Sequence, residues 1–538
     1  MGADPVRNPI VVESASRLEV TLPPPPPPPT APVAERSLTR SAVLTAIASL
    51  VDYGAQLVTT LVVTPIVVNG LGGPLFGVWE MLKQSVGYMT ATDGRPMDAL
   101  RLVTANQQAN PDAGLKRRYV GAALIVWLLF LPVVTLAGAI LVGLTPTITK
   151  VAPELRGTIQ IACALLVLGF LTGTLAAIPE AVLRGMNLGY KRMGWQAGLS
   201  VVGGVLAAGA VSAGWGLEGL GAAQLALAGL TGMCFWVLVR RYVPAFGVAR
   251  PSKPEVTSLL RMSAWLTGGQ VLSQVLLASD VLILGVMVSP ALVATYVLTG
   301  AAARMAVTLF NFTVGATIPG LGGLLGQQEY DRAAQIRGDL VTLTWLFVTV
   351  GGAAILLWNR SFVSLWVGGQ HYAGVWANLL IVGVMTQTAF IRGDAFVIDA
   401  ALRPRSRVIV TAVAGALTVA AALALTPALG IVGLCLGLLA GRLPQTLIYP
   451  QLVASCLGRS RTVSLAPIAR RLAVMAVAFA GAAWLGQRVL VHDWLTWLGG
   501  VALTGVVLLG VVLVAGLSPD ARRAVLARCR AMGRTVRG

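Results

Sequence analysis

The sequence predicts an all-α protein that crosses a membrane about fourteen times. Of its 538 residues, 56% are hydrophobic and only 11% are charged, and the mean hydropathy is +0.79. Apolar runs of roughly 20 residues, the length that crosses a bilayer as a helix, recur along most of the chain. The basic residues lie between these runs rather than in one patch, so the net charge of +19 does not indicate a nucleic-acid partner.

The chain begins with a polar arm that contains seven consecutive prolines, Pro23–Pro29. Such a run favours a solvated polyproline II conformation without a hydrophobic core. We therefore expect residues 1–40 to form a disordered cytoplasmic arm, of which transport does not need residues 1–35. A docking segment for a proline-binding module is the alternative.

Fourteen candidate spans follow the arm. Their predicted bounds are 42–68, 77–102, 119–143, 157–180, 194–214, 217–239, 258–288, 291–318, 338–359, 373–400, 406–426, 429–453, 469–487 and 494–517. They predict an N-terminal six-helix half at 41–240, a basic cytoplasmic linker at 241–257, a C-terminal six-helix half at 258–455, two additional helices at 456–517 and a basic cytoplasmic tail at 518–538.

The charges of the connecting segments predict the orientation. With the amino terminus inside, 31 of the 40 lysines and arginines fall in cytoplasmic segments, and the opposite side holds only Lys150, Arg156, Arg360 and Arg488. This is the asymmetry that the positive-inside rule describes. It predicts that both termini are cytoplasmic, and it requires the charged stretch 77–102 to cross the membrane.

This second span is unusual because it carries six charged residues. A charge at mid-bilayer depth costs about 2.5–3.5 kcal/mol on insertion scales, so the segment cannot face lipid. Pro96 removes a backbone donor and disfavours a helical conformation at Arg95. The pattern predicts a broken helix that lines a cavity, with these charges: Glu80, Lys83, Asp93, Arg95, Asp98 and Arg101.

The two halves resemble each other in sequence. A short turn at 72–74 precedes Phe76-Gly77-Val78-Trp79, and a similar turn at 289–290 precedes Val293-Ala294-Thr295-Tyr296. Parallel repeats within one chain are typical of transporters. We therefore expect pseudo-symmetric halves, formed by spans 1–6 and 7–12, with a central cavity between them and both turns near its external gate.

Polar side chains on spans 1, 2, 7, 8 and 10 share helix faces that would line such a cavity. Among the ionisable ones, Arg304 lies in an otherwise apolar or weakly polar span, on the same face as Thr308 and Asn311. Intramembrane charges are commonly functional. The alternative is interhelical bonding that only locks the bundle, and for Arg304 an ion pair with Asp280 or Asp52. For Arg392 and Asp399 a position at the helix end is equally compatible.

No cofactor, metal site or catalytic constellation is predicted. The two histidines are too far apart in sequence to form a local ligand pair, and the cysteines are scattered. No external loop is long enough for an enzyme that carries its catalytic groups on a loop. The residues concerned are His371, His492, Cys163, Cys234, Cys435, Cys456 and Cys529.

Three segments resemble the polysaccharide flippases of the multidrug/oligosaccharidyl-lipid/polysaccharide (MOP) exporter superfamily. They are LGGPLFGVWEML at 71–82, TDGRPMDALRLVTANQQ at 92–108 and ASDVLILGVMVSPALVATYVLT at 278–299. In the second segment, Asp93-Gly94 stands where the family has Asp-Leu-Gly, and Arg95-Pro96 follows. In the third, Asp280, Gly285 and Tyr296 match. Fourteen spans are also similar to the lipid II flippase branch.

The resemblance implies a flippase that moves an undecaprenyl-diphosphate-linked oligosaccharide across a bacterial inner membrane by alternating access. A diphosphate headgroup requires a hydrated cationic cavity. The substrate-binding candidates are then Arg304, Arg95, Lys83, Arg392, Asn311, Gln270 and Gln274, and the ion-coupling candidates are Asp52, Asp280, Asp93 and Asp98. Membrane lipids are expected partners, as are a polysaccharide polymerase and export machinery.

Other function classes remain open at this point. A drug or cation antiporter of the same superfamily would favour acidic cavity residues, whereas this set is mixed. An integral membrane glycan polymerase or glycosyltransferase and a non-transporting scaffold are the further alternatives.

Overall fold

The computed structural model describes residues 33–107, 110, 112–244, 246–315, 318–401, 404–457, 465–517 and 522–523. Within this part of the chain the protein is all-α, as predicted, with seventeen α-helices, three short 3-10 helices and no strand. Residues 1–32 of the predicted arm, most of the predicted tail, and the side chains of residues 33–50 and 269–278 lie outside the described residues. Residues 33–40, which were predicted to be disordered, are helical and form the start of the first helix.

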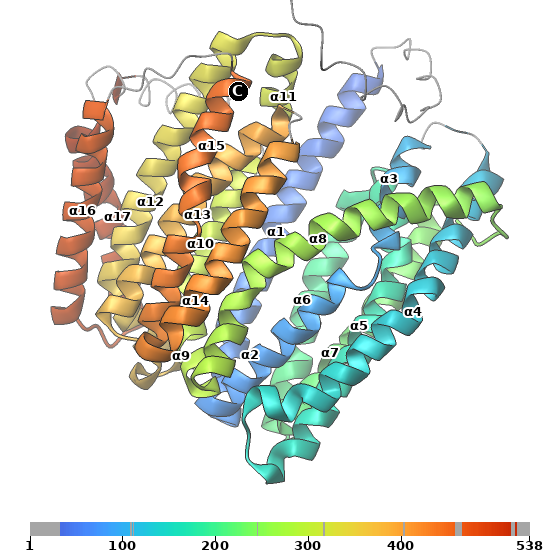
Figure 1. Cartoon of the computed structure of the whole chain (residues 1–538), viewed down its shortest axis with the longest axis horizontal. Coiled ribbons are helices and arrows are strands. Elements are labelled where there is room, and N and C mark those ends of the chain that lie inside the picture. Colours follow the sequence, from blue (N-terminus) through green and yellow to red (C-terminus); the bar gives the residue numbers. More distant parts are fainter. Residues whose placement is uncertain are drawn as a thin grey trace, which may run out of the picture.

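Seven helices precede the middle of the chain and occupy one side of the molecule (Figure 1). They are α1 (Val33–Leu71), α2 (Gly73–Tyr88), α3 (Pro96–Asn106), α4 (Ala113–Thr149), α5 (Arg156–Gly185), α6 (Gly189–Ser212) and α7 (Gly216–Tyr242). The 3-10 helices η1 (Met89–Ala91) and η2 (Pro153–Leu155) lie between them.

The remaining helices form the second half and its additions. They are α8 (Lys253–Met287), α9 (Pro290–Thr299), α10 (Ala301–Gly315), α11 (Ile318–Gly326), α12 (Tyr330–Val367), α13 (Val375–Ala400), α14 (Pro404–Gly441), α15 (Leu443–Cys456), α16 (Leu465–Arg488) and α17 (Trp494–Gly516), with η3 (Gly369–His371) after α12.

Ten of the described helical segments are long and apolar enough to cross a membrane, and the pair α9–α10, bent by 51°, makes an eleventh. One of the ten, Ser406–Cys456, holds two predicted spans that join at Gly430, where φ is 57°. The predicted second and seventh spans correspond in sequence to the broken pair α2–α3 and to the long helix α8. The predicted all-α, polytopic fold class is confirmed.

The predicted interruption of the second span is present. Helix α2 ends at Tyr88, and α3 begins at Pro96. Between them Gly94 and Arg95 adopt left-handed conformations, with φ values of 68° and 50°. A Cβ atom at position 94 would lie 2.4 Å from the Phe130 ring, so the break requires glycine there for both space and backbone conformation.

The two halves meet tightly at the ends of α2 and α9. A Cβ atom at Gly77 would lie 1.8 Å from the carbonyl oxygen of Pro290, and one at Gly285 would lie 2.3 Å from Met81 Sδ. Glycine at both positions permits this close approach. The halves diverge toward the other end of the molecule, where α3 and α11 lie (Figure 1). The repeated segments noted in the sequence therefore form the closed end.

Helix α8 belongs to both halves by its contacts. Its first turn is bound to α4 by an ion pair in which Glu255 Oε1 lies 2.7 Å from Arg118 Nε, and Ser252 and Glu255 form a capping box. Its last turns pack in the C-terminal half through Ile283 and Leu284. The predicted boundary at residue 258 therefore falls within a helix that contacts both halves, and Leu259 packs in the N-terminal half.

The two additional helices pack on the C-terminal half. Trp358 of α12 donates to Thr504 of α17 at 3.0 Å, and Trp345 donates to the carbonyl of Arg471 at 3.1 Å. Arg470 donates to the carbonyls of Val514 and Leu517, each at 3.2 Å, and so satisfies carbonyl groups at the end of α17. Both helices extend the bundle on the side of the C-terminal half, and Trp497 of α17 packs against the hydrophobic cluster that includes Phe362.

Candidate functional site

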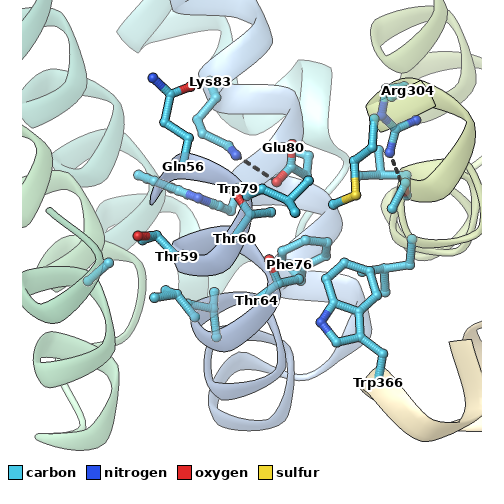
Figure 2. A pocket seen from close by; sticks show the side chains of 18 of the residues that line it. Gln56, Thr59, Thr60, Thr64, Phe76, Trp79, Glu80, Lys83, Arg304 and Trp366 are labelled. Atoms are coloured by element: carbon cyan, nitrogen blue, oxygen red, sulfur yellow. Dashed lines mark hydrogen bonds and ion pairs between the residues drawn. The ribbon is translucent and has the colours of Figure 1, made fainter. Parts of the chain in front are cut away.

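A cavity of about 530 Å³ lies between the two halves, as the sequence predicts. Helices α1, α2 and α7 line it from one half, and α9, α10 and the end of α12 line it from the other. Figure 2 shows its polar and aromatic side chains. The charged ones are Glu80, Lys83 and Arg304.

On the α2 side the charges are paired. Lys83 Nζ lies 2.7 Å from Glu80 Oε1, three residues earlier on the same helix face. The ammonium also lies 5.8 Å from the centre of the Trp79 ring. The lysine side chain remains 41% exposed, and the carboxylate 18%. Lys83 is thus held at the cavity wall with donor capacity left for a ligand.

Arg304 faces this pair from the other half (Figure 2). It lies one turn after the α9–α10 bend, and its guanidinium donates to the carbonyl of Val297. A Cβ atom at Gly300 would lie 2.7 Å from Nη1, so glycine there makes room for the guanidinium. Within the described residues Arg304 makes no ion pair.

The predicted structural alternative for Arg304, an ion pair with Asp280 or Asp52, does not form. Asp280 accepts a hydrogen bond from the Tyr296 hydroxyl at 2.8 Å. Asp52 accepts one from Gln56 at 3.2 Å, and its other carboxylate oxygen is buried without a partner among the described residues. Neither aspartate lines the central cavity.

The bend that positions Arg304 is fixed by distant residues. Asn359 Nδ2 of α12 donates to the carbonyl of Thr299 at 2.9 Å and to Asn378 at 2.8 Å. The Thr299 hydroxyl accepts from the backbone N–H of Ala373 at 2.9 Å. The two Asn359 bonds are buried and the Ala373 bond is partly buried, and together they hold the end of α9 while α10 turns away from it.

A stripe of hydroxyl and amide side chains completes the cavity wall. Gln56, Thr60 and Thr64 follow one another at four-residue spacing on α1, with Thr59 beside them, and Gln224 projects from α7. Gln56 and Thr59 belong to the polar face predicted for the first span, but none of these five residues was among the predicted ligands. The four-residue spacing was the available signal.

Two hydrogen bonds join the halves across this region. The Tyr53 hydroxyl of α1 donates to the carbonyl of Met305 on α10 at 3.0 Å. Trp366 Nε1 of α12 donates to the carbonyl of Leu61 at 2.7 Å. Trp366 and Phe76 also belong to the large hydrophobic cluster at the closed end. The part of the cavity nearest the closed end is therefore aromatic, and the part farther from it is polar.

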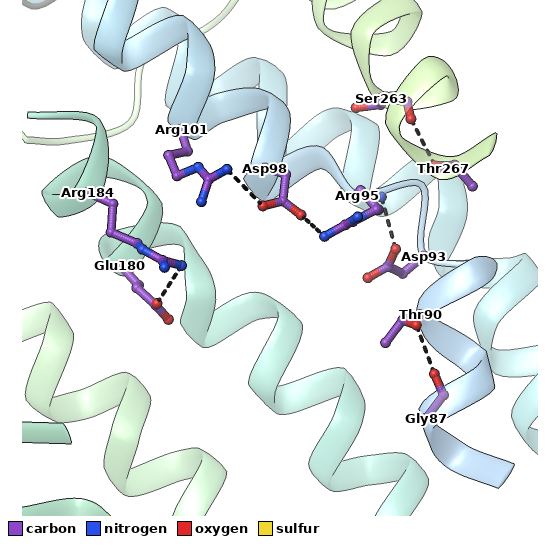
Figure 3. Close-up of polar contacts among 10 residues, drawn as sticks. All are labelled: Gly87, Thr90, Asp93, Arg95, Asp98, Arg101, Glu180, Arg184, Ser263 and Thr267. Atoms are coloured by element: carbon purple, nitrogen blue, oxygen red, sulfur yellow. Dashed lines mark hydrogen bonds and ion pairs between the residues drawn. The ribbon is translucent and has the colours of Figure 1, made fainter. Parts of the chain in front are cut away.

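A second cavity, of about 160 Å³, lies inside the N-terminal half at the helix break. Here the charges form a network (Figure 3). Arg95 lies 2.6 Å from Asp98, which lies 3.9 Å from Arg101. Asp93 accepts the backbone N–H of Arg95 at 2.9 Å. Contrary to the prediction of one central cavity, Arg95, Asp93 and Asp98 line this separate one.

A third cavity, of about 280 Å³, lies between α5 and α7, beside the first two. It shares Gln224 with the central cavity, and it shares Ala177 and Glu180 with the cavity at the helix break. Glu180 lies 2.7 Å from the buried Arg192 and 3.4 Å from Arg184. Small residues of α5, Gly169 and Gly173 among them, leave the space.

The remaining predicted ligands lie elsewhere. Arg392 of α13 is half-buried, within electrostatic range of Arg407 and Arg442, and lines none of the cavities described above. Asn311 lies two turns beyond Arg304, and its Oδ1 is buried without a partner among the described residues. The side chains of Gln270 and Gln274 lie outside the described residues, although their backbone belongs to α8.

The fold and the cavity define a membrane transporter, and comparisons with known proteins give its family. The family model described as polysaccharide biosynthesis protein matches residues 38–324, more than half of the chain. The protein therefore belongs to the polysaccharide biosynthesis protein family, and the predicted recognition is confirmed. A comparison with curated protein sequences gives no match.

Solved structures of the MOP superfamily share the fold at low identity. An inward-facing MATE family multidrug resistance transporter has a TM-score of 0.63 at 15% identity, covering 77% of this chain and 99% of its own. The lipid II flippase MurJ, in an inward closed conformation, has a TM-score of 0.62 at 12% identity, covering 87% and 97%. A MOP superfamily transporter from Pyrococcus furiosus, described as having a binding pocket of reverse polarity, has a TM-score of 0.54 at 14% identity, covering 78% and 96%.

Together these findings make the protein a multi-pass membrane flippase or transporter. Its family and its structural neighbours are transporters rather than enzymes.

Proposed function

We propose that the protein flips a polyprenyl-diphosphate-linked oligosaccharide across a bacterial inner membrane by alternating access. The observation that carries the proposal is Arg304, a permanent cation that lines the central cavity without a carboxylate partner among the described residues. A guanidinium without such a partner in a membrane protein is costly unless a ligand or water meets it, and its planar fork fits phosphate oxygens.

The rest of the cavity supports the same class of ligand. Two cations and one carboxylate give it a net positive charge, which favours an anionic headgroup over a cationic drug. The stripe of Gln56, Thr60 and Thr64 offers donors and acceptors for sugar hydroxyls. Trp79 and Trp366 add apolar surface to the wall. The prenyl chain remains in the bilayer.

The cavities of the N-terminal half support a coupling role for Asp93 and Asp98. They are connected to the central cavity by shared lining residues, through Gln224 and then Glu180. A proton or small cation that reaches this network would change the Arg95–Asp98 pairing beside the helix break. Asp52, whose second carboxylate oxygen has no partner among the described residues, and Asp280 stay in the proposal as further candidates.

The proposed orientation places both termini in the cytoplasm, which makes the closed α2–α9 end external. Cysteines introduced at Glu218 and Gln370, on opposite halves beside the predicted external loops, test it. Both should react with a membrane-impermeant maleimide from the outside of intact cells. Reaction only after the cells are opened would contradict the orientation.

Measurement of lipid-linked glycan in deletion cells tests the function itself. Cells without the protein should accumulate a polyprenyl-diphosphate-linked glycan on the cytoplasmic leaflet, and the wild-type chain should clear it. The Arg304→Ala variant should fail to clear the glycan. The control variant Arg332→Ala, which changes an exposed residue of α12, should clear it as the wild type does. A deletion that changes drug sensitivity without glycan accumulation would favour the antiporter alternative.

A further inference from the structure

A fourth cavity, of about 350 Å³, lies in the C-terminal half between α12, α13, α15 and α16. Within the described part of the chain it shares no lining residue with the three cavities of the proposed transport path. Most of its wall is apolar and includes Leu340, Val341, Phe390, Ile468 and Leu472. A volume of this size with a mainly apolar lining is in the range of small-molecule sites, about 300–1,000 Å³.

The polar groups of this cavity carry a net positive charge. Arg337 Nη2 lies 3.0 Å from Asp394 Oδ1, and its Nε is buried without a hydrogen-bond partner among the described residues. The Arg471 guanidinium lies 5.7 Å from the centre of the Trp345 ring, and it donates to Thr342 Oγ1 at 3.3 Å. No described carboxylate pairs with Arg471, so the lining of this cavity contains two guanidinium groups and one carboxylate.

The cavity is polar at one end and opens along a lipid-facing helix. Arg471 lies near the start of α16, next to Arg470, which binds the last carbonyls of α17. This is the end of the bundle that the charge asymmetry places at the cytoplasmic surface. Ile468 and Leu472 line the cavity and are 43% and 52% exposed, so one wall is accessible from the bilayer.

We propose that this cavity binds an anionic glycerophospholipid. Its phosphate would accept hydrogen bonds from Arg471 and from Arg337 Nε, and an acyl chain would lie along the apolar wall. Basic pockets between transmembrane helices on the cytoplasmic side hold anionic head groups in this way, and arginine matches phosphate geometry. The bound lipid would fill the space between α16 and helices α13 and α15, and so stabilise the docking of the additional helices.

Thermal unfolding of the full-length protein in detergent tests the proposal. Phosphatidylglycerol should raise the unfolding temperature saturably, because a ligand that binds only the folded state stabilises it, and phosphatidylcholine should not. Loss of a charge-assisted contact corresponds to at least about a tenfold change in affinity. Arg471→Gln should therefore raise the half-saturating lipid concentration about tenfold or more.

The matched control is Arg488→Gln, at the other end of α16, where the guanidinium lies 4.1 Å from the Trp484 ring centre. It removes the same charge from the same helix and should leave the phosphatidylglycerol response unchanged. An equal loss in both variants would overturn the proposal, because it would show that the response reflects only the net charge of the protein.

A second variant fills the cavity without changing charge. A Cβ atom at Gly393 would have Thr344 Oγ1 as its nearest neighbour, at 3.7 Å, so this position can accept a side chain. Because Gly393 lines the cavity, a larger side chain there would extend into it. Gly393→Leu should abolish the response even if Arg471→Gln fails to fold. A response retained in Gly393→Leu, or a polyprenyl monophosphate that saturates the site at lower concentration than phosphatidylglycerol, would overturn the assignment of a phospholipid.

Discussion

The central cavity and the cavity at the helix break are both polar and both contain arginine, yet their charges are arranged differently. In the central cavity Lys83 has a carboxylate partner while Arg304 has none within the described residues. At the helix break Arg95, Asp98 and Arg101 bind one another within a few residues of sequence. One site therefore keeps a cation available, and the other neutralises its own charges.

This difference separates two uses of buried charge. An available cation in a cavity between mobile halves is suited to an anionic ligand that comes and goes. A neutralised network beside a helix break is suited to holding one backbone conformation, with its pairing open to change by a proton or cation. The following predictions test the contrast, beginning with the largest expected effect.

Linking the two halves at their closed end should stop transport completely. The exposed Pro74 and Ala291 can be replaced by cysteine in a chain whose native cysteines have been replaced. Gly72 is not used because its φ of 77° disfavours any other residue. A cleavable bis-maleimide should abolish flipping, and cleavage of the linker should restore it. Single-cysteine variants given the same reagent serve as controls. Full transport by the linked protein would show that the halves do not separate there.

Removing the available cation should affect transport far more than stability. Arg304→Ala loses charge-assisted contacts of about 1.5–3 kcal/mol to the ligand, so flipping should fall about 10- to 100-fold. Its thermal unfolding should stay near the wild-type value, because no described carboxylate loses a partner. Arg304→Lys should be partly active, since an ammonium cannot copy bidentate binding. Normal transport by Arg304→Ala would refute the proposed role.

Releasing Lys83 should make the central cavity bind anions more tightly. Glu80→Gln removes the carboxylate that lies 2.7 Å from the ammonium, so a glycan-diphosphate analogue should bind roughly several-fold more tightly, within the range of a partly exposed pair. Lys83→Met should weaken binding by a similar factor. Isothermal calorimetry on the purified protein measures both. Weaker binding by Glu80→Gln, or unchanged or tighter binding by Lys83→Met, would contradict a binding role for Lys83.

Breaking the network at the helix break should mainly lower stability. Asp98→Asn leaves Arg95 and Arg101 without this carboxylate, but both are about a third exposed, so the loss should be only about 1 kcal/mol or less. The double variant Arg95→Gln, Asp98→Asn should recover part of it if the pair is structural. Denaturant unfolding of the purified protein provides the comparison. A complete loss of transport in stable Asp98→Asn would instead favour the coupling role.

The features of the fold that local sequence determines could be predicted. Gly94-Arg95-Pro96 indicates the broken span, because proline cannot continue a helix and glycine accepts a left-handed backbone. The 51° bend between α9 and α10 could not be predicted. It depends on the bond from Asn359 to Thr299, which are sixty residues apart, and neither residue signals a bend by itself.

The site was predictable only in part, for a related reason. A single helical period across 77–102 places Asp98 and Arg101 near the face of Lys83, but the two left-handed residues at 94 and 95 end that period. Helix α3 starts with a new phase and carries its charges into the N-terminal half. Gln224 was missed because a single amide in an apolar span has no pattern to mark it.

The available charge of Arg304 would also make the proposed transport cycle depend on the membrane potential. A guanidinium that moves relative to the membrane field gains or loses about 2.3 kcal/mol per elementary charge for each 100 mV crossed. In the proposed orientation a negative interior draws this cation toward the cytoplasm, so a polarised membrane favours the empty protein that faces inward. A diphosphate bound at Arg304 reverses the sign of the moving charge, so the same voltage then drives the loaded protein outward.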